Sequence, residues 1–189
     1  MAELTKFLSG THASLLDGKT ILSGAKEINV TAWSYSSQTG AWTLTPSATG
    51  IPLESIVADS LTISQDDPEE NNIECETSDA PIKSVVTQGA YHIEMTCADL
   101  QSDIMTTLLG YEEVTGGYLI APTAKPDLYV AIEIVFDNKT LVCPKVNLAS
   151  KLDVSSVKSE TAKVTISGTL EEYEVTTGKK TPFFIFTRA

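Results

Sequence analysis

Proton-transfer chemistry has few candidate residues in this sequence, which contains two histidines, His12 and His92. A Ser–His–Asp triad would have to use one of them as its general base. His12 lies in a weakly patterned N-terminal stretch, whereas His92 alternates with apolar residues in an expected strand. No Gly-x-Ser-x-Gly sequence is present to expose a serine nucleophile. We therefore expect no catalytic residue, a solvated His92 and a protein that is not an enzyme.

Metal ligands are equally sparse. The cysteines, Cys75, Cys97 and Cys143, are odd in number and share no zinc-ligand spacing with each other or with His92. The acidic stretch from Asp66 to Asn72 offers carboxylate and amide oxygens, which are calcium ligands, but it lacks the residue order of a calcium loop. We expect this stretch to be the solvated tip of a hairpin, and we predict no metal and no cofactor.

The net charge of the chain disfavours some classes of binding partner. The chain carries 25 acidic and 13 basic residues, a formal net charge of −12. Such a surface repels nucleic-acid phosphates and anionic lipids, so tight DNA binding and a membrane partner are not expected. Phosphate-binding glycine loops, apolar runs long enough to span a bilayer and an N-terminal apolar signal segment are all absent from the sequence. We expect the protein to be made in the cytoplasm.

Alternating apolar residues predict a mainly β protein. Residues 90–98 are the clearest case. One face of this expected strand is apolar and consists of Tyr91, Ile93, Met95 and Cys97; the other is polar and consists of His92, Glu94 and Thr96. Residues 128–136 and 140–154 alternate in the same way around a turn at 137–139, and Pro144 indicates an edge or a bulge. Because strands follow one another in hairpin order, we expect an antiparallel β-sandwich or barrel with one packed α-helix.

Several further elements follow from the same patterns. A helix should run from a cap at Asp99 to Gly110, with an apolar stripe that includes Ile104 and Leu108. Residues 59–65 and 73–77 should form a hairpin around the acidic stretch, followed by a loop at 78–81. The apolar residues change from even-numbered to odd-numbered positions at Glu171 and Glu172, and this shift in the alternation predicts a bulge with one inserted residue.

The domain organisation is expected to be simple. Residues 1–18 should form an N-terminal arm, and residues 19–189 a single β-sandwich domain. The stretch at about 35–52 is rich in Ser, Thr, Gly and Pro and should be a long surface loop.

Some features favour self-assembly. Residues 128–136 have few charged neighbours to protect them, and an unguarded strand edge invites pairing with another chain. The apolar residues of the two termini are the candidate subunit-interface residues: Leu4, Phe7, Leu8, Phe183, Phe184 and Phe186. The alternative is that both termini dock on their own domain.

The order of these elements resembles the tail tube proteins of long-tailed phages, which are related to the tube proteins of contractile tails and of type VI secretion. The resemblance covers roughly residues 55–175 and rests on strand 58–64, the acidic stretch, strands 73–77 and 90–97, the helix and the late strand 164–170. It implies a β-sandwich with a flanking helix, a mobile N-terminal segment and a long loop. It also implies a virion tail component that forms hexameric rings, stacks them into a tube and contacts other tail proteins.

The resemblance would place wet strand faces on a channel through which DNA passes. The candidate lumen-facing residues are Glu74, Glu76, His92 and Glu94. An acidic bore would repel DNA phosphates and let the genome pass without binding. The alternative is that these side chains simply face bulk water.

Two other function classes remain open. One is a monomeric ligand- or carbohydrate-binding β-sandwich module that would use Trp33, Tyr35 and Trp42 as an aromatic patch, although packing is the expected use of these rings. The other is an enzyme of an unfamiliar type, which the scarcity of histidine disfavours.

Overall fold

The protein is mainly β, as predicted. The computed structural model describes residues 12–15, 24–36, 41–44, 50–75, 78–98, 101–119, 128–137, 139–153, 162–176 and 178–188. Its first strands are β1 (His12–Leu15), β2 (Glu27–Ser36), β3 (Ala41–Leu44), β4 (Ile51–Pro52), β5 (Thr62–Gln65), β6 (Glu69–Cys75), β7 (Ser78–Thr87) and β8 (Tyr91–Cys97). After helix α1 (Ser102–Thr107) come β9 (Glu112–Val114), β10 (Gly117–Leu119), β11 (Leu128–Val135), β12 (Lys139–Leu148), β13 (Lys151–Asp153), β14 (Lys163–Leu170), β15 (Tyr173–Thr176), β16 (Lys179–Thr181) and β17 (Phe184–Arg188).

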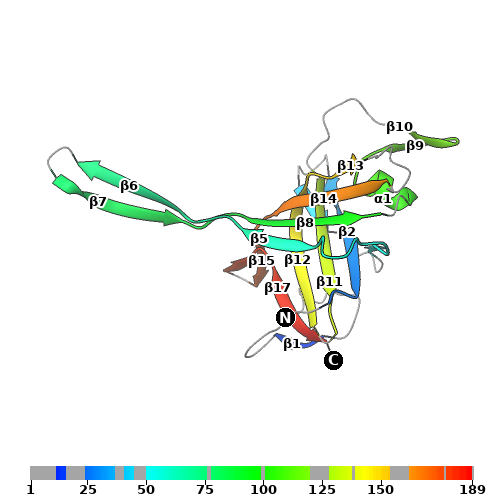
Figure 1. Cartoon of the computed structure of the whole chain (residues 1–189). Coiled ribbons are helices and arrows are strands. Elements are labelled where there is room, and N and C mark those ends of the chain that lie inside the picture. Colours follow the sequence, from blue (N-terminus) through cyan, green and yellow to red (C-terminus); the bar gives the residue numbers. More distant parts are fainter. Residues whose placement is uncertain are drawn as a thin grey trace.

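One large antiparallel sheet forms the body, in the order β3-β2-β11-β12-β14-β8-β5. Figure 1 shows β5, β8 and β14 running across β2, β11 and β12, so the sheet folds over itself into two layers. Among the described strands the sheet does not close into a barrel, because β5 pairs with β8 alone and β3 with β2 alone. The result is a sandwich made from one sheet, which removes apolar side chains of both layers from water.

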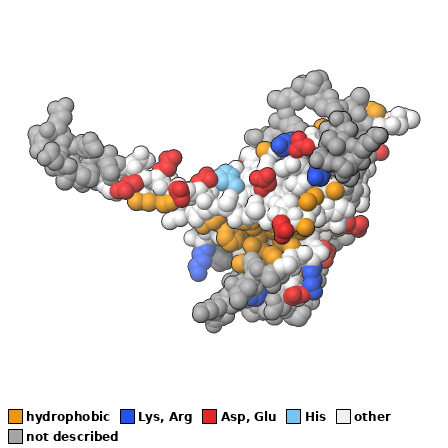
Figure 2. Space-filling model, viewed as in Figure 1, with side chains coloured by type: hydrophobic (Ala, Val, Ile, Leu, Met, Phe, Trp, Pro, Cys, Tyr) orange, Lys and Arg blue, Asp and Glu red, His pale blue; other side chains and the backbone are white. Residues whose placement is uncertain are grey.

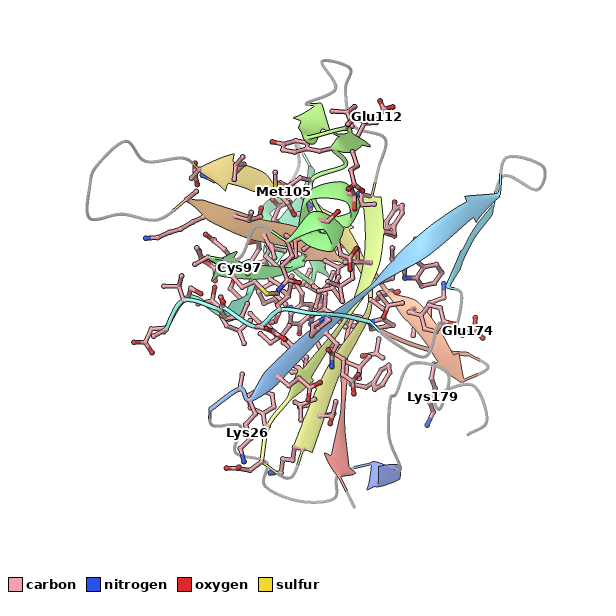
Figure 3. The ribbon with its side chains drawn as sticks, turned by 90° about the vertical axis from the view of Figure 1, so that its right-hand side faces the viewer. Lys26, Cys97, Met105, Glu112, Glu174 and Lys179 are labelled. Atoms are coloured by element: carbon pink, nitrogen blue, oxygen red, sulfur yellow. The ribbon has the colours of Figure 1, made fainter. Side chains whose placement is uncertain are left out.

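The core lies between these layers. Val30, Ile132 and Ile166, from three different strands, are fully buried there. In Figure 3, Cys97 and Met105 lie toward the interior, whereas the labelled charged residues lie at the periphery. Helix α1 adds the apolar stripe that the sequence predicts: Ile104, Met105, Leu108 and Leu109 are all buried.

The helix is shorter than the sequence indicates. It begins after Gln101, whose side chain makes no capping hydrogen bond, and Asp99 lies outside the described residues. Gly110 has a φ of 65°, the left-handed conformation that ends a helix, as expected. The six-residue helix therefore owes its stability to packing of its apolar stripe and not to capping.

Strand β11 corrects the expectation of an unguarded edge at 128–136. It lies inside the sheet, paired with β2 on one side and β12 on the other. Residues on both of its faces are buried, including Ile132 on one face and Glu133 on the other. An interior strand offers no free backbone groups to another chain, so this stretch cannot act by strand addition.

The hairpin expected around the acidic stretch is also wrong. Strand β5 pairs with β8, while β6 pairs with β7, so the two ladders form one long, interrupted hairpin. Glu69 and Glu70 start β6, and Asp66 and Asp67 lie just before it, so the acidic stretch does not form a tip. Strand β7 covers the loop expected at 78–81. Figure 1 shows β6 and β7 extending far from the body, and we call this ribbon the β6–β7 arm. Pro81 is tolerated in β7 because it lies where the β6–β7 register shifts, between the pairs Ile73–Lys83 and Cys75–Ser78.

Pro144 lies at a bulge, as predicted. The β11–β12 register shifts between Val130 and Ile132, opposite Pro144. At the same place β12 changes its other neighbour, from β17 at residues 139–142 to β14 at residues 146–148. A residue without an N–H fits where neither neighbouring ladder requires a donor.

The remaining segments differ in detail from expectation. The parity shift at Glu171 and Glu172 is not a bulge: β14 ends, and the chain starts a separate ribbon, β15–β16. Strand β3 lies within the loop expected at about 35–52 and pairs with the end of β2. Strand β1 lies within the expected N-terminal arm and pairs with β17.

Candidate functional site

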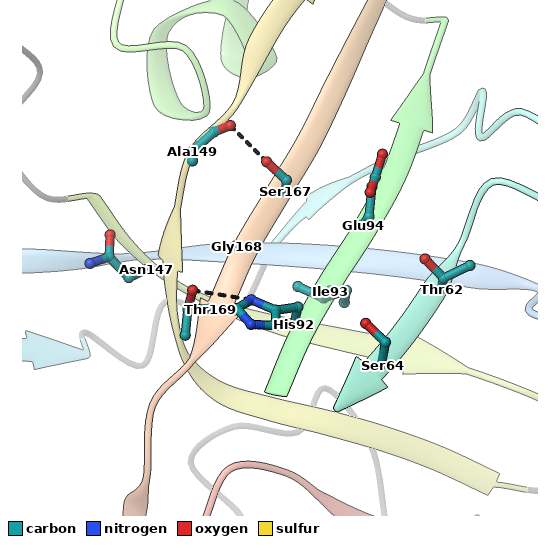
Figure 4. Close-up of a pocket in the computed structure, with 10 residues that line it drawn as sticks. All are labelled: Thr62, Ser64, His92, Ile93, Glu94, Asn147, Ala149, Ser167, Gly168 and Thr169. Carbon is teal, nitrogen blue, oxygen red and sulfur yellow. Dashed lines mark hydrogen bonds between the residues drawn. The ribbon is translucent and has the colours of Figure 1, made fainter. Parts of the chain in front are cut away.

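The polar face of β5, β8 and β14 is the most organised group of polar side chains in the described residues. Strand register aligns two rows across the three strands: Ser64, His92 and Thr169 in one, and Thr62, Glu94 and Ser167 in the other. These rows, with Asn147 and Ala149, line an open hollow of about 360 Å³ (Figure 4). Period-two alternation turns the intervening residues Ile63, Ile93 and Ile166 to the core on the other side of the sheet.

His92 connects this face to the base of the β6–β7 arm. Its Nε2 lies 2.9 Å from Oδ2 of Asp66, and its Nδ1 lies 3.3 Å from Oγ1 of Thr169. Both nitrogens are satisfied when Nε2–H donates to the Asp66 carboxylate and the Thr169 hydroxyl donates to Nδ1. The His92 and Asp66 side chains are 40% and 62% exposed, so water also reaches the pair. We call the three residues the root clamp.

A hydroxyl, an imidazole and a carboxylate in this order invite comparison with a catalytic triad, but the surroundings do not support that chemistry. The N–H groups of β14 point sideways into its ladders with β8 and β12, so they do not project onto the face as oxyanion donors. Ser167, the next hydroxyl, donates to the carbonyl of Ala149 at 2.8 Å. The face therefore positions polar groups without assembling a nucleophile, a base and an oxyanion site.

The acidic stretch does not gather into a cation site. Among the described residues, no group of three or more His, Cys, Asp or Glu side chains is arranged to hold a metal ion. Asp66 is directed to His92, whereas Glu70 accepts a hydrogen bond from Ser84 across the arm. Extension of the chain as β6 separates carboxylates that a calcium loop would bring together.

The structure separates the candidate lumen residues. His92 and Glu94 lie together on the polar face, whereas Glu74 lies in β6 on the arm. Glu76 falls outside the described residues. His92 and Glu94 therefore remain the candidates that share one surface.

The candidate subunit-interface residues fall into two groups, one outside the described residues and one in the C-terminal strand. Leu4, Phe7 and Leu8 lie outside the described residues. Phe184 is buried in its own sheet, and Phe183 packs edge-on against Tyr91 with ring centroids 5.3 Å apart. Phe186 lies in β17, which pairs with β12 and β1. The described part of the C-terminal segment thus docks on its own domain.

The aromatic patch has a packing role at Trp33. The indole Nε1 donates to the carbonyl of Pro144 at 3.0 Å, and the ring meets Tyr173 edge-on with centroids 5.9 Å apart. Tyr35 and Trp42 are register partners on β2 and β3. Trp33 therefore anchors the β15–β16 ribbon to the bulge of β12.

Two cysteines are core residues. Cys97 and Cys143 are buried free thiols, and burial raises the pKa of Cys143 from 9.0 to about 12. A thiol that stays protonated at neutral pH is a poor nucleophile.

Sequence reasoning identified His92 but not its partners. Thr169 and Asp66 lie 77 and 26 residues from His92 in sequence. Only the strand register brings them together, and no local signal specifies that register.

Comparisons with known proteins do not place the chain in a family. No family model and no curated protein matches its sequence. Among solved structures it is similar to a chain of the cryo-EM structure of the anti-feeding prophage baseplate, 6-fold symmetrised, at 7% identity and a TM-score of 0.39. That match covers 89% of this chain and 97% of the other. A likeness this distant assigns no role. Within the described residues, no helix is long and apolar enough to cross a membrane.

Proposed function

We propose that this chain is a structural subunit that assembles with copies of itself, as the rings of a phage-like tail tube do. The observation that carries the proposal is the β6–β7 arm, which leaves the body and pairs only with itself in the described structure (Figure 1). An isolated two-stranded ribbon is marginally stable in water and needs a second surface to pack on. Another subunit would supply that surface.

The arm carries the features of a contact surface. Val86 is 61% exposed, and Val85 is also exposed. Val114, on the β9–β10 ribbon, is the other large exposed hydrophobic residue among those described. Both edges of the arm have backbone groups free for strand addition. Figure 2 shows hydrophobic and acidic side chains side by side on the part of the arm near the body.

Charge favours contact between an arm and the body of another subunit. Residues 66–89 hold seven carboxylates and one lysine, so two arms repel each other. Residues 139–189 hold eight basic and five acidic side chains, a positive balance that suits an acidic partner. A contact between unlike surfaces is heterologous, and repetition of such a contact builds rings or stacks.

The polar face is our candidate for the channel wall. Glu94, His92 and the surrounding hydroxyls present a wet surface with no lysine or arginine lining the hollow. An acidic wall repels phosphates, so DNA could pass without binding. Other tail proteins would then be the further partners, and the virion tail the location.

Electron microscopy of the concentrated protein tests assembly directly. We expect rings or tubes of the wild type, and folded monomers of a variant in which a short glycine-rich turn replaces residues 70–86. Val86→Lys should weaken assembly, whereas Val114→Lys serves as the matched control because it adds the same charge at the other exposed valine. Wild-type protein that stays monomeric at every concentration would count against the proposal. Assembly of the arm-deleted variant would show that the arm is not the joint.

A monomeric ligand-binding module is the second candidate, and the hollow on the polar face is the observation that favours it. Trp33 does not offer this candidate an exposed aromatic platform, because its indole N–H donates a hydrogen bond to the carbonyl of Pro144. Saccharide-array binding that is lost in Glu94→Ala, by a protein that never assembles, would favour this candidate instead.

A further inference from the structure

We propose that the root clamp fixes the direction of the β6–β7 arm relative to the body. This inference concerns the isolated subunit and does not require assembly. It follows from an interruption in the long hairpin, the contacts that bridge it and the close approach of the two chains at Gly89.

The interruption separates the arm from the body. The β5–β8 ladder ends at the pair Gln65–Tyr91, and the β6–β7 ladder begins at the pair Glu69–Thr87. Between them Pro68 has no N–H, and the backbone bond present is Asp66 N–H to the carbonyl of Ala90, at 2.9 Å. A short break in a two-stranded ladder is where the ribbon bends most easily.

Side chains bridge this break. Asp66 meets His92, which lies on the body strand β8 and contacts Thr169 on β14. On the arm side, Nε2 of Gln65 lies 3.2 Å from Oε1 of Gln88 and 3.3 Å from the carbonyl of Gly89. The hydrogen-bond chain therefore runs from the middle of the sheet to the first residue after β5.

Gly89 permits the two chains to approach at the break. A Cβ atom there would lie 2.0 Å from the carbonyl oxygen of Asp66 and 2.5 Å from its carbon. Because the obstructing atoms are backbone, a side chain at position 89 must push Asp66 away from its present place. The position of Asp66 thus depends on a glycine opposite it.

The other side chains around His92 belong to the body. Glu94 follows on the same face of β8. The neighbouring strands β5 and β14 contribute Ser64, Ser167 and Thr169, and β12 contributes Asn147. Asp66 is therefore the side chain through which His92 reaches the root of the arm.

A distance measurement between arm and body tests the inference. Spin labels at Val85→Cys and Glu54→Cys, in a Cys75→Ser background, report the arm position by pulsed electron resonance. The background leaves the buried Cys97 and Cys143 in place. We expect the population in the clamped position to fall about two- to fivefold when His92→Ala removes the clamp, as for loss of an exposed pair.

Variants distinguish the clamp from a general change of the polar face. His92→Ala and Asp66→Ala should each broaden the distance distribution, whereas Glu94→Gln, on the same face of β8, should leave it unchanged. Gly89→Ala should also broaden the distribution by displacing Asp66. An arm position that is unchanged in both His92→Ala and Asp66→Ala, or one that changes as much in Glu94→Gln, would overturn the proposal. Monomeric samples give this readout, so failure to assemble does not affect it.

Discussion

The centre of the body and the β6–β7 arm are built by the same antiparallel pairing but have opposite surroundings. Ile132 in β11 is 0% exposed, with a neighbouring strand on each side and buried residues on both faces. Val86 in β7 has one neighbouring strand and is 61% exposed. Hydrogen-bonded ladders alone exchange water for backbone partners at little net gain, whereas burial of apolar area drives folding. The comparison teaches that the body can stand alone and that the arm depends on its root or on a partner.

The largest expected difference between the two regions is in cavity formation. Ile132→Ala should lower the free energy of unfolding by about 2–5 kcal/mol, because the void lies in a fully packed core. Val86→Ala should change it by less than about 0.5 kcal/mol. Denaturant titration measures both. Equal losses would show that the arm is packed as tightly as the body.

The next largest difference in stability should come from replacing a glycine by alanine in a packed strand and in an exposed ribbon. A Cβ at Gly168 would lie 2.6 Å from Cγ1 of Val146 and 2.7 Å from the carbonyl oxygen of Asn147. Gly168→Ala should therefore cost about 1–3 kcal/mol. Gly117, in the two-stranded β9–β10 ribbon, has no atom within 4 Å of that position, so Gly117→Ala is the matched control and should be nearly neutral. Thermal unfolding of the two variants decides the point.

High pH should weaken the body through Cys143. Burial raises the pKa of this thiol from 9.0 to about 12, so the folded chain keeps a proton that the unfolded chain releases above pH 9. The free energy of unfolding is unaffected by this thiol well below pH 9, and from about one pH unit above 9 it falls by about 1.4 kcal/mol per pH unit until the folded-state thiol titrates near pH 12. Between about pH 10 and 11, the wild type should lose about that much more stability than Cys143→Val. Parallel curves for the two proteins would contradict the assignment.

The smallest expected difference is between two ion pairs. Lys145 is partly buried, pairs with Glu171 and lies 4.4 Å from the centre of the Tyr129 ring. Lys145→Met should cost about 1 kcal/mol, because it leaves Glu171 without this partner. Lys26→Met breaks the exposed pair with Asp137 and should cost less than about 0.5 kcal/mol. A double-mutant cycle on each pair separates the pair from the packing of the lysine stem.

The sequence predicted strands where alternation was strong and failed where pairing had to be chosen. Strands β8 and β14 and the β11–β12 hairpin follow from period-two patterns and a short turn, all of which are local. The partner of β5 did not follow, because the polar stretch after it resembles a turn as much as the start of a strand. Strand β6 ends at Cys75 and β7 begins at Ser78, and no Gly, Pro or Asn lies between them in the sequence.

The candidate site was predictable in part for the same reason. The wet side of β8 identified His92 and Glu94 as a pair. Their cross-strand partners depend on register, which is set by packing of the whole sheet and not by neighbouring residues. The short helix shows the same limit, since its apolar stripe was visible but its start at Ser102 was not.

The pairing of β1 with β17 has a consequence for biosynthesis. His12 opposes Arg188, so an early segment of the chain must wait for a much later one to be translated. The β6–β7 ladder joins residues close in sequence, whereas contacts between distant segments form late. Because an isolated ribbon is marginally stable, the arm is firmly held only after β14 has supplied Thr169 to the root clamp. A chaperone that holds early segments apart would protect β1 until β17 has been made.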